Sequence, residues 1–160
     1  MHSLETISHY GYIACYVALA LGLFGLPVPD EIVLTFIGTL TATSSFSYTS
    51  VLFITFGGVL TGALFTYGIG RWIGAPFLQR FGHWIGLNEQ RLATIDKWSK
   101  SYGSKMAFIG FLIPGMRHLI CYFAGMNKLS LKKSAGYAIS GAIVSTVLYI
   151  TIGHYIARSM

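Results

Sequence analysis

The stretch GLPVPDEIVLTFIGTL, residues 25–40, decides the fold because it is apolar at both ends and broken in the middle. Pro27 and Pro29 lie two residues apart, a spacing that the interior of a regular helix does not tolerate. The apolar run that follows, residues 32–40, is nine residues long. At about 1.5 Å per residue it covers roughly 13 Å, less than half of a hydrocarbon core. We therefore predict a re-entrant hairpin over residues 26–45, with the polar TATSSFSYTS stretch as a loop.

Charged residues are too scarce for a soluble domain of this size. Hydrophobic residues make up 54% of the 160 residues and charged residues 10%, against about 25% charged in typical soluble domains. The composition excludes a soluble domain, a disordered chain and a coiled coil, and it favours an integral membrane protein. Three intervals without Asp, Glu, Lys or Arg are long enough for a span of roughly 20 residues. They contain 24, 39 and 24 residues and lie between Glu5 and Asp30, Glu31 and Arg71, and Lys133 and Arg158.

These intervals predict about three full spans, over residues 9–25, 49–70 and 134–157. Gly58 and Gly62 form a GxxxG pattern in the second span. This pattern favours close packing of membrane helices, and the ordinary tolerance of membrane helices for glycine explains it equally well. The fold class that we predict is an all-α integral membrane protein with these spans and two re-entrant helical hairpins in an inverted repeat.

Residues 71–105 differ from the rest of the chain, because they carry six basic residues against two acidic ones. In NEQRLATIDKWSK, residues 88–100, the apolar Leu92, Ile95 and Trp98 have helical spacing beside a charged face. Such an amphipathic helix lies along the membrane surface or docks on the protein. The positive-inside rule predicts that the whole segment is cytoplasmic.

A second broken stretch lies in residues 106–127, which we predict to be another re-entrant hairpin. Eight apolar residues, MAFIGFLI, precede Pro114 and Gly115, and nine more, HLICYFAGM, follow the break PGMR. Each half of the chain, residues 9–70 and 106–160, therefore has a proline-bearing hairpin followed by a glycine-containing span. The halves show no residue-level identity, so the repeat rests on hydropathy. Inverted repeats with broken helices are typical of transporters with a site near the bilayer midplane.

Asp30, Glu31 and Arg117 are charged residues at the hairpin tips, with apolar sequence on both sides. An ionised side chain at membrane depth costs at least about 2.5–3.5 kcal/mol, so it is retained where it is paired, hydrated or used. We predict that the tips meet, with Arg117 facing Glu31 across a polar cavity, because non-helical backbone at that depth must line such a cavity. A buried ion pair that holds the hairpins in register is the alternative.

The chemistry of these residues fits a phosphate site with a proton-responsive gate. A guanidinium offers a planar fork of donors that suits a phosphate, and N–H groups freed after Pro29 and Pro114 add donors for an anion. Desolvation raises the pKa of a carboxylate, so Glu31, with Asp30, is expected to exchange a proton or bind a coupling ion.

Two further residues are candidates for headgroup binding. Arg71, at the end of a span, is expected to snorkel to the interface and to assist there. His118, directly after Arg117, is expected to bind a headgroup or share a proton, with simple packing in its helix as the alternative.

Three motifs occur in order: PxPxE, GxxxxYxxGR, and PGxR followed by AGM. Together they resemble the DedA family of bacterial membrane proteins, over about residues 10–157. The resemblance implies an inverted repeat with two re-entrant hairpins and lipid transport across the cytoplasmic membrane. It also implies undecaprenyl phosphate or phosphatidylethanolamine as cargo and a dependence on a proton or sodium gradient. The motif residues are Pro27, Pro29, Glu31, Gly62, Tyr67, Gly70, Arg71, Pro114, Gly115, Arg117, Ala124, Gly125 and Met126.

This chain departs from the family pattern at three positions. Family members often carry an acidic residue near the position of Gly22, an Asp at that of Ala63 and an arginine at that of Phe111. The joint absence of an acid and an arginine leaves no unpaired charge behind, while Asp30 is an extra acid beside Glu31. The identity of the lipid, the direction of transport and the coupling ion therefore do not follow from the resemblance.

The function that we expect is translocation of a phosphate-headgroup lipid by one membrane domain, residues 1–160, in the bacterial cytoplasmic membrane. An ion- or proton-coupled small-solute transporter or channel is the alternative. A lipid-phosphate enzyme lacks a nucleophile–base pair and an Asp-rich metal motif, and a purely structural role leaves the buried charges unused. We expect no catalytic residue, no cofactor, no metal and no nucleic-acid partner, and we leave a homo-oligomer open.

Overall fold

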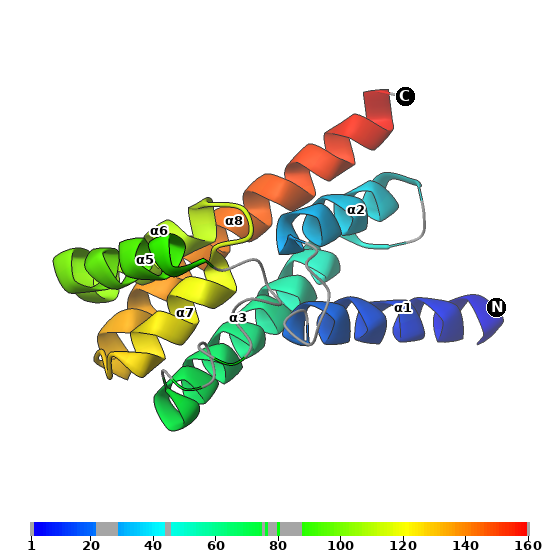
Figure 1. The fold of residues 1–160 in the computed structure, drawn as a ribbon. Helices are drawn as coiled ribbons and strands as arrows, with labels where there is room; N and C mark the ends of the chain where they lie inside the picture. The colour runs from blue at the N-terminus through cyan, green and yellow to red at the C-terminus, as the bar shows by residue number, and fades with distance from the viewer. Residues whose placement is uncertain are drawn as a thin grey trace. The chain divides into compact units, whose positions relative to one another are not determined.

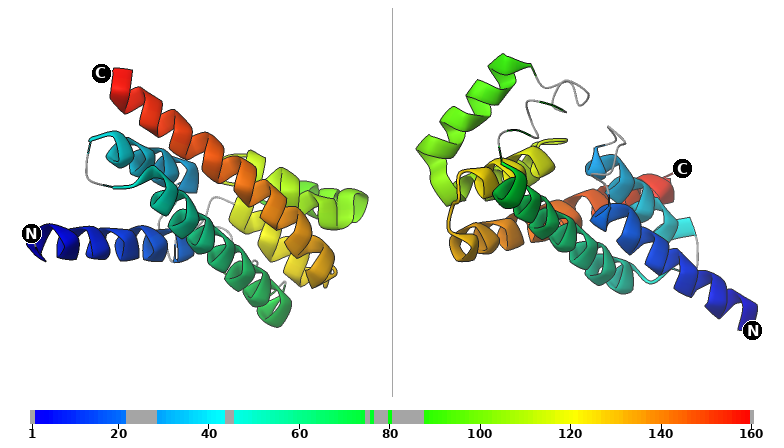
Figure 2. Two further views of the ribbon diagram at one scale, coloured as in Figure 1. Left: turned by 180° about the vertical axis from the view of Figure 1, so that it is seen from behind. Right: turned by 60° about the horizontal axis from the view of Figure 1, so that its bottom comes forward.

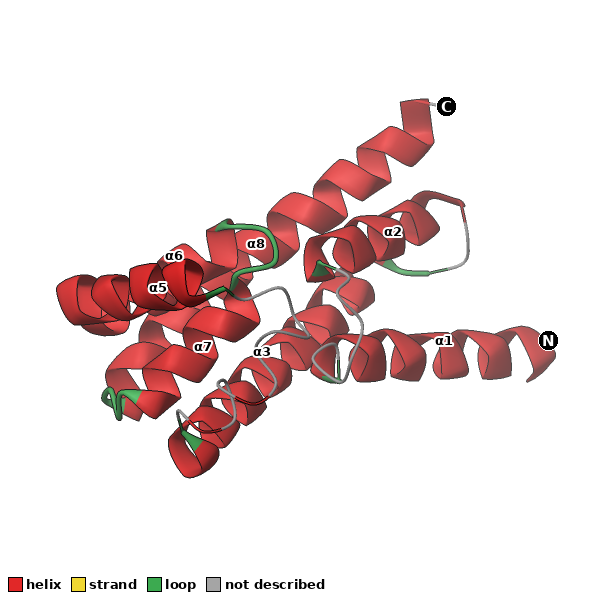
Figure 3. Ribbon diagram, in the orientation of Figure 1, coloured by secondary structure: helices red, strands yellow, loops and turns green. Residues whose placement is uncertain are grey.

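The computed structural model describes residues 2–21, 29–43, 46–74, 76, 80 and 88–159. Within these ranges the chain is helical and contains no strand (Figure 3), which confirms the all-α class. The helices, labelled in Figure 1, divide into two compact units. Unit 1 comprises Met1–Gly62 and Ala142–Met160, and unit 2 comprises Ala63–Gly141. Each unit is described by itself below.

The second and third predicted spans are confirmed as long helices. They are α3 (Tyr48–Ile73) and α8 (Leu131–Ser159), with mean hydropathies of 1.7 and 1.6. Of the residues that the structure describes, these two helices are long and apolar enough to cross a membrane. In their most apolar windows, 39% and 33% of the residues are buried within the chain, so most residues of these windows keep some exposed surface.

The first predicted span, residues 9–25, has the wrong bounds. Helix α1 (His2–Ala20) begins earlier, and Leu21 no longer belongs to it. Hydropathy marks apolar residues and carries no information on where backbone hydrogen bonding starts, so the polar first turns were missed. The apolar part of α1, Tyr10–Ala20, is short for a span, and a third full span stays a prediction.

The GxxxG glycines of α3 allow α1 to approach closely within unit 1. A Cβ atom on Gly58 or Gly62 would lie under 3.0 Å from a backbone carbonyl oxygen of α1, that of Tyr16 or Leu19. Real Cβ atoms do not approach backbone oxygens so closely. Close packing, one of the two explanations of this pattern, is therefore what the structure shows.

Helix α2 (Asp30–Thr43) begins directly after Pro29 and extends three residues beyond the predicted apolar run. The loop predicted for residues 41–43 is wrong, because the threonine hydroxyls bond to carbonyls of their own helix. Thr39, Thr41 and Thr43 donate such bonds at 2.7, 2.7 and 3.1 Å. With 14 residues, α2 covers about 21 Å, still short of a hydrocarbon core. Gly22, Pro27 and the rest of the predicted hairpin, residues 26–28 and 44–45, lie outside the described residues.

The second broken stretch forms a helix–turn–helix in unit 2. Helix α6 (Met106–Leu112) ends at the predicted break, and α7 (Arg117–Met126) follows it. Gly115 in the turn has φ +75°, a left-handed conformation that favours glycine. The break at PGMR is thus confirmed, with Arg117 as the first residue of α7 rather than part of the turn.

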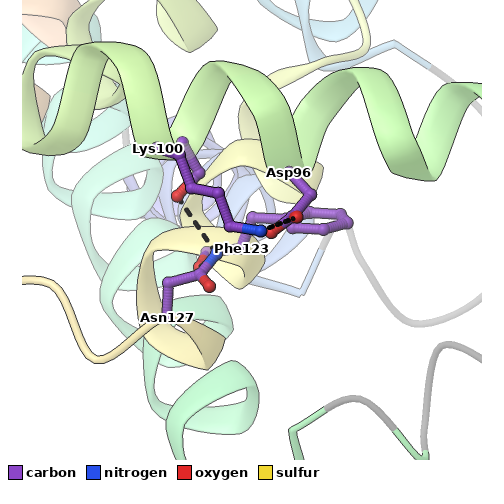
Figure 4. Close-up of polar contacts among 5 residues, drawn as sticks. Asp96, Lys100, Phe123 and Asn127 are labelled. Atoms are coloured by element: carbon purple, nitrogen blue, oxygen red, sulfur yellow. Dashed lines mark hydrogen bonds and ion pairs between the residues drawn. The ribbon is translucent and has the colours of Figure 1, made fainter.

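The amphipathic segment forms α5 (Glu89–Tyr102) and docks on α7 within unit 2. Asn88 caps the helix by accepting a bond from the Arg91 amide at 3.0 Å. Ile95 packs in a buried cluster with residues of α6 and α7, and the three helices lie side by side (Figures 1 and 2). Asn127 donates bonds to Ser99 Oγ at 3.0 Å and to the Phe123 carbonyl at 3.1 Å (Figure 4). Of the two predicted modes for this helix, docking on the protein is therefore observed.

A crossing of two helices at paired glycines recurs in both units. In unit 1, α2 crosses α8, and a Cβ atom on Gly38 would lie under 3.0 Å from the Ile150 carbonyl oxygen. In turn, a Cβ atom on Gly153 would lie equally close to the Thr35 carbonyl oxygen. The two helices run in the same direction (Figures 1 and 2).

In unit 2, α7 crosses α3 in the same register. Gly70 lies against the carbonyl of Tyr122, and Gly125 lies against that of Tyr67. In all four cases the contacted carbonyl belongs to the residue three positions before the partner helix's glycine.

The shared register aligns PVPDEIVLTFIG, residues 27–38, with PGMRHLICYFAG, residues 114–125. It also aligns residues 62–71 with residues 145–154. In this register Pro27 matches Pro114, Phe36 matches Phe123 and Gly38 matches Gly125, so the expected lack of residue-level identity is wrong at these few positions. The alignment was hidden because it joins each short helix to the long helix of the other half of the chain.

Candidate functional site

Arg117 starts α7 and is buried, with 3% of its surface exposed. Its guanidinium carbon lies 5.7 Å from the centre of the Phe111 ring, a cation–π geometry. A cation at a helix N-terminus opposes the helix dipole, and Met116 provides no side-chain cap there. Charge and dipole together make this helix start strongly positive, which favours an anion.

His118 lies beside Arg117, and its role in headgroup binding stays a prediction. An Arg117 guanidinium N–H donates to His118 Nε2 at 3.1 Å. Because a guanidinium only donates, Nε2 accepts, and the imidazole is neutral with its proton on Nδ1. Nδ1 then donates to the Thr66 hydroxyl of α3 at 3.3 Å. His118 therefore orients the guanidinium from one side.

Arg71 lies near the C-terminal end of α3 and is exposed. It donates to the Tyr67 hydroxyl at 3.1 Å, and that hydroxyl donates to the Leu129 carbonyl at 2.6 Å. The motif GxxxxYxxGR thus ties α3 to the segment after α7. Its glycine, Gly70, meets Gly125 of the AGM motif at the crossing.

Asp30 and Glu31 start α2 in unit 1 and are buried, with 5% and 8% of their surfaces exposed. In the register of the crossings they occupy the positions of Arg117 and His118, eight and seven residues before the crossing glycine. Acids at a helix N-terminus complement its dipole. Glu31 lies close enough to Tyr149 of α8 to interact electrostatically with it.

Within each unit the structure brings together the predicted residues of one hairpin, Asp30 with Glu31 and Arg117 with His118. Asp30 and Glu31 belong to one unit and Arg117 to the other, so the pairing of Glu31 with Arg117 stays a prediction. Sequence reasoning missed Thr66 and Tyr149. Each lies four residues before a glycine at a helix crossing. This spacing can be recognised only when it is known which helices cross at those glycines.

Comparison with known proteins identifies the family. A family model described as the VTT domain matches residues 28–155. The chain belongs to the VTT-domain, or DedA, family. Two glycines of the motifs that resemble this family, Gly70 and Gly125, lie at the crossing of α3 and α7, where a side chain would not fit.

Named relatives support a role in membrane transport. The chain is 42% identical to the uncharacterized membrane protein YbfM of Bacillus subtilis, over 95% of this chain and 94% of that protein. It is 31% identical to undecaprenyl phosphate transporter A of Staphylococcus aureus, over 97% of this chain and 78% of that protein. A more distant relative, 24% identical over 94% of this chain and 72% of that protein, is an alkaline phosphatase-like protein of Lactococcus lactis. No solved structure matches the chain.

Proposed function

We propose that this VTT-domain protein translocates a phosphate-headgroup lipid across the bacterial cytoplasmic membrane. The lipid is undecaprenyl phosphate or phosphatidylethanolamine. Transport is secondary and uses a proton or sodium gradient. In this proposal the chain is a transporter rather than an enzyme, and segment 71–105 faces the cytoplasm.

The observation that carries the proposal is the buried, oriented guanidinium of Arg117. Its contacts with Phe111 and neutral His118 fix it at the positive start of α7. A fixed guanidinium at a helix N-terminus provides both the charge and the donor geometry that a phosphate needs. The name of the Staphylococcus aureus relative supports the same chemistry, since undecaprenyl phosphate carries a phosphate headgroup.

The proposal assigns distinct roles to the two short helices. The α2 and α6–α7 segments are re-entrant hairpins whose tips meet, so that Arg117 faces Glu31. The headgroup passes through the polar cavity between the tips while the apolar tail stays in the bilayer. Protonation or cation binding at Glu31, with Asp30, releases the guanidinium for the phosphate, and Arg71 assists near the cytoplasmic interface.

The test is lipid flux in proteoliposomes with Arg117→Ala, Arg117→Lys and the control Arg91→Ala, which removes an exposed guanidinium from α5. We expect Arg117→Ala to lower flux of a labelled polyprenyl phosphate at least about 100-fold, the loss typical of a charge-assisted site worth about 3 kcal/mol. Arg117→Lys keeps the charge without the fork and should retain part of the flux. Arg91→Ala should leave the flux unchanged.

Three outcomes would overturn the proposal. Normal lipid flux in a folded Arg117→Ala protein removes the headgroup role from that residue. Arg117-dependent uptake of a small solute, without lipid flux, would favour the solute transporter instead. Phosphate release from the lipid by the wild-type protein would favour an enzyme.

A further inference from the structure

His154 of α8 lies next to the α2–α8 crossing of unit 1, and the proposed mechanism does not use it. It directly follows the crossing glycine Gly153, just as Arg71 directly follows the crossing glycine Gly70 in unit 2. The shared register of the two crossings therefore makes His154 the counterpart of Arg71. Both side chains can carry a positive charge, but histidine carries it only when the ring is protonated.

The ring of His154 is held by a threonine of α2. The Thr41 hydroxyl donates its single proton to the Gly38 carbonyl at 2.7 Å. The same hydroxyl oxygen lies 2.8 Å from His154 Nδ1, so it accepts there and Nδ1 carries a proton. Tyr48 of α3 packs edge-on against the ring, with 5.5 Å between the ring centres. The ring of His154 therefore keeps its orientation whether or not its second nitrogen is protonated.

Arg71 is fixed at the corresponding place in unit 2. There the Tyr67 hydroxyl joins Arg71 to the Leu129 carbonyl, just beyond the end of α7. In unit 1, Thr41 holds His154 in the last turn of α2. In both units, the residue that follows the crossing glycine is thus tied to the C-terminal end of the short helix, which supports an equivalent role for the two residues.

The second ring nitrogen of His154, Nε2, can bind a ligand. Among the residues that the structure describes, Nε2 makes no hydrogen bond, and the side chain is partly exposed. In the neutral ring Nε2 only accepts, whereas in the protonated ring it is a charged donor. Charged N–H donors form strong hydrogen bonds to phosphate oxygens. The ring therefore suits a phosphate in its protonated form and not in its neutral form.

The groups that surround His154 do not repel an anion. Residues 34–43 of α2, which include the part packed against the ring, contain no titratable side chain. Tyr48 of α3 and Tyr155 of α8 contact the ring, with ring centres 5.5 and 6.0 Å away, and tyrosine is uncharged where histidine titrates. Arg158 lies one turn further along α8 and adds a positive charge. These neighbours include no acid.

The proposed topology places His154 and Arg71 at opposite faces of the membrane. In the proposed function segment 71–105 faces the cytoplasm, so Arg71 lies toward the inner face. The first turn of α8 contains the basic residues Lys132 and Lys133, which the positive-inside rule also assigns to the cytoplasm. Since α8 then crosses the membrane, its last turns, with His154, lie toward the outer face.

We propose that protonated His154 binds the phosphate of the lipid headgroup at the outer face, as the counterpart of Arg71 at the inner face. This inference rests on the proposed function, because the lipid and the orientation of α8 both come from it. A guanidinium stays charged at every working pH, so binding at Arg71 does not depend on pH. Histidine changes its charge between about pH 5 and about pH 8, so binding at His154 strengthens as the outer pH falls.

The experiment follows the protonation of His154 by NMR in the purified full chain with ¹⁵N-labelled histidine. The chain contains five histidines, and the signal that is lost in His154→Gln identifies the one in question. A ligand that binds the protonated ring about tenfold more tightly raises the midpoint of its titration by about one pH unit. We expect this rise with farnesyl phosphate, a short polyprenyl phosphate, and none with farnesol, which lacks the phosphate.

Two threonine variants separate positioning from a general effect on α2. Thr41→Val removes the acceptor of Nδ1, so the ring loses its orientation and the rise caused by farnesyl phosphate should fall to less than about half. Thr43→Val removes an exposed hydroxyl that bonds only to its own helix, at 3.1 Å. It should leave the rise unchanged. Inorganic phosphate at the same concentration should give a smaller rise, because no tail holds it at the protein.

A merely structural His154 gives a different result. Its titration midpoint would then be the same with farnesyl phosphate and with farnesol, which overturns the outer phosphate site. If lipid flux still depends on Arg117 in that case, the proposed function stands without this site. A rise that depends on farnesyl phosphate, in a protein that transports no lipid, keeps the site and overturns the proposed function. An equal rise with inorganic phosphate overturns the lipid as the source of the phosphate.

Discussion

The α2–α8 crossing of unit 1 and the α7–α3 crossing of unit 2 share one backbone geometry and carry opposite charges. In both, a short helix that follows a proline meets a long helix at a pair of glycines, with identical spacing. The short helix begins with Asp30 and Glu31 in unit 1 and with Arg117 and His118 in unit 2. The acids complement the helix dipole, whereas Arg117 opposes it.

This difference separates what the fold requires from what the chemistry requires. The glycines and their spacing recur because the backbones touch, and no other residue fits there. The backbone contact does not constrain the first residues of α2 and α7, and these residues carry charges of opposite sign. A positive start suits an anionic headgroup, and a negative start suits a coupling cation or a proton.

The largest effect should come from adding one carbon at a crossing. Gly125→Ala in unit 2 and Gly153→Ala in unit 1 would each place a Cβ atom against a backbone oxygen that has no side-chain freedom to move. We expect each to lower the free energy of unfolding by about 3 kcal/mol, the upper end for overpacking. Titration with a denaturing detergent measures this.

The matched controls are Gly68→Ala in α3 and Gly136→Ala in α8, where an added Cβ atom meets nothing within 4 Å. Both should leave stability unchanged or raise it by about 0.5–1 kcal/mol, because alanine favours the helix. If Gly125→Ala and Gly68→Ala changed stability equally, the close approach of the helices at the crossings would not require glycine, which would contradict the shared role of the two crossings. Unequal effects at Gly125 and Gly153 would show which crossing is tighter.

A smaller effect should distinguish the polar contacts of the two units. Tyr67→Phe removes the hydroxyl that joins Arg71 to the Leu129 carbonyl, and it should cost about 1 kcal/mol of unfolding free energy. Tyr48→Phe in unit 1 removes one bond to the Thr151 hydroxyl. Tyr48→Phe should cost less unfolding free energy, because the remaining Thr151 hydroxyl can bond to a carbonyl of its own helix. A larger loss for Tyr48→Phe would contradict this ranking.

Much of the fold follows from the sequence because hydropathy and prolines act locally. The long apolar intervals predict α3 and α8, and PGMR predicts the turn before α7. The extent of α2 was underestimated, because the hydroxyls of Thr41 and Thr43 are satisfied inside the helix rather than by water. The first turns of α1 were missed for a related reason, since polar residues there still form backbone hydrogen bonds.

The sequence predicts which charged residues belong to the candidate site, but it does not predict which residues they contact. Buried acids and a buried arginine stand out because charge is costly in an apolar segment. Thr66 does not stand out, since threonine is common in membrane helices and its role depends on which helix it faces. That information lies in contacts between distant segments, such as Gly38 with Ile150.

The most direct test of the account is whether positions 31 and 117 lie next to each other in the membrane. Glu31→Cys and Arg117→Cys would be combined in a chain in which Ala replaces Cys15 and Cys121. A protease site between the two positions would be added, and a short bifunctional thiol reagent applied to native membranes. The control pairs Arg117→Cys with Ile32→Cys, on the exposed face of α2. The account predicts that cleaved fragments stay joined for 31 with 117 and separate for the control. The parent chain, with Ala at positions 15 and 121, must first be shown to transport lipid. If the cleaved fragments then separate for 31 with 117 as well as for the control, the two oppositely charged helix starts do not meet, and the account is contradicted.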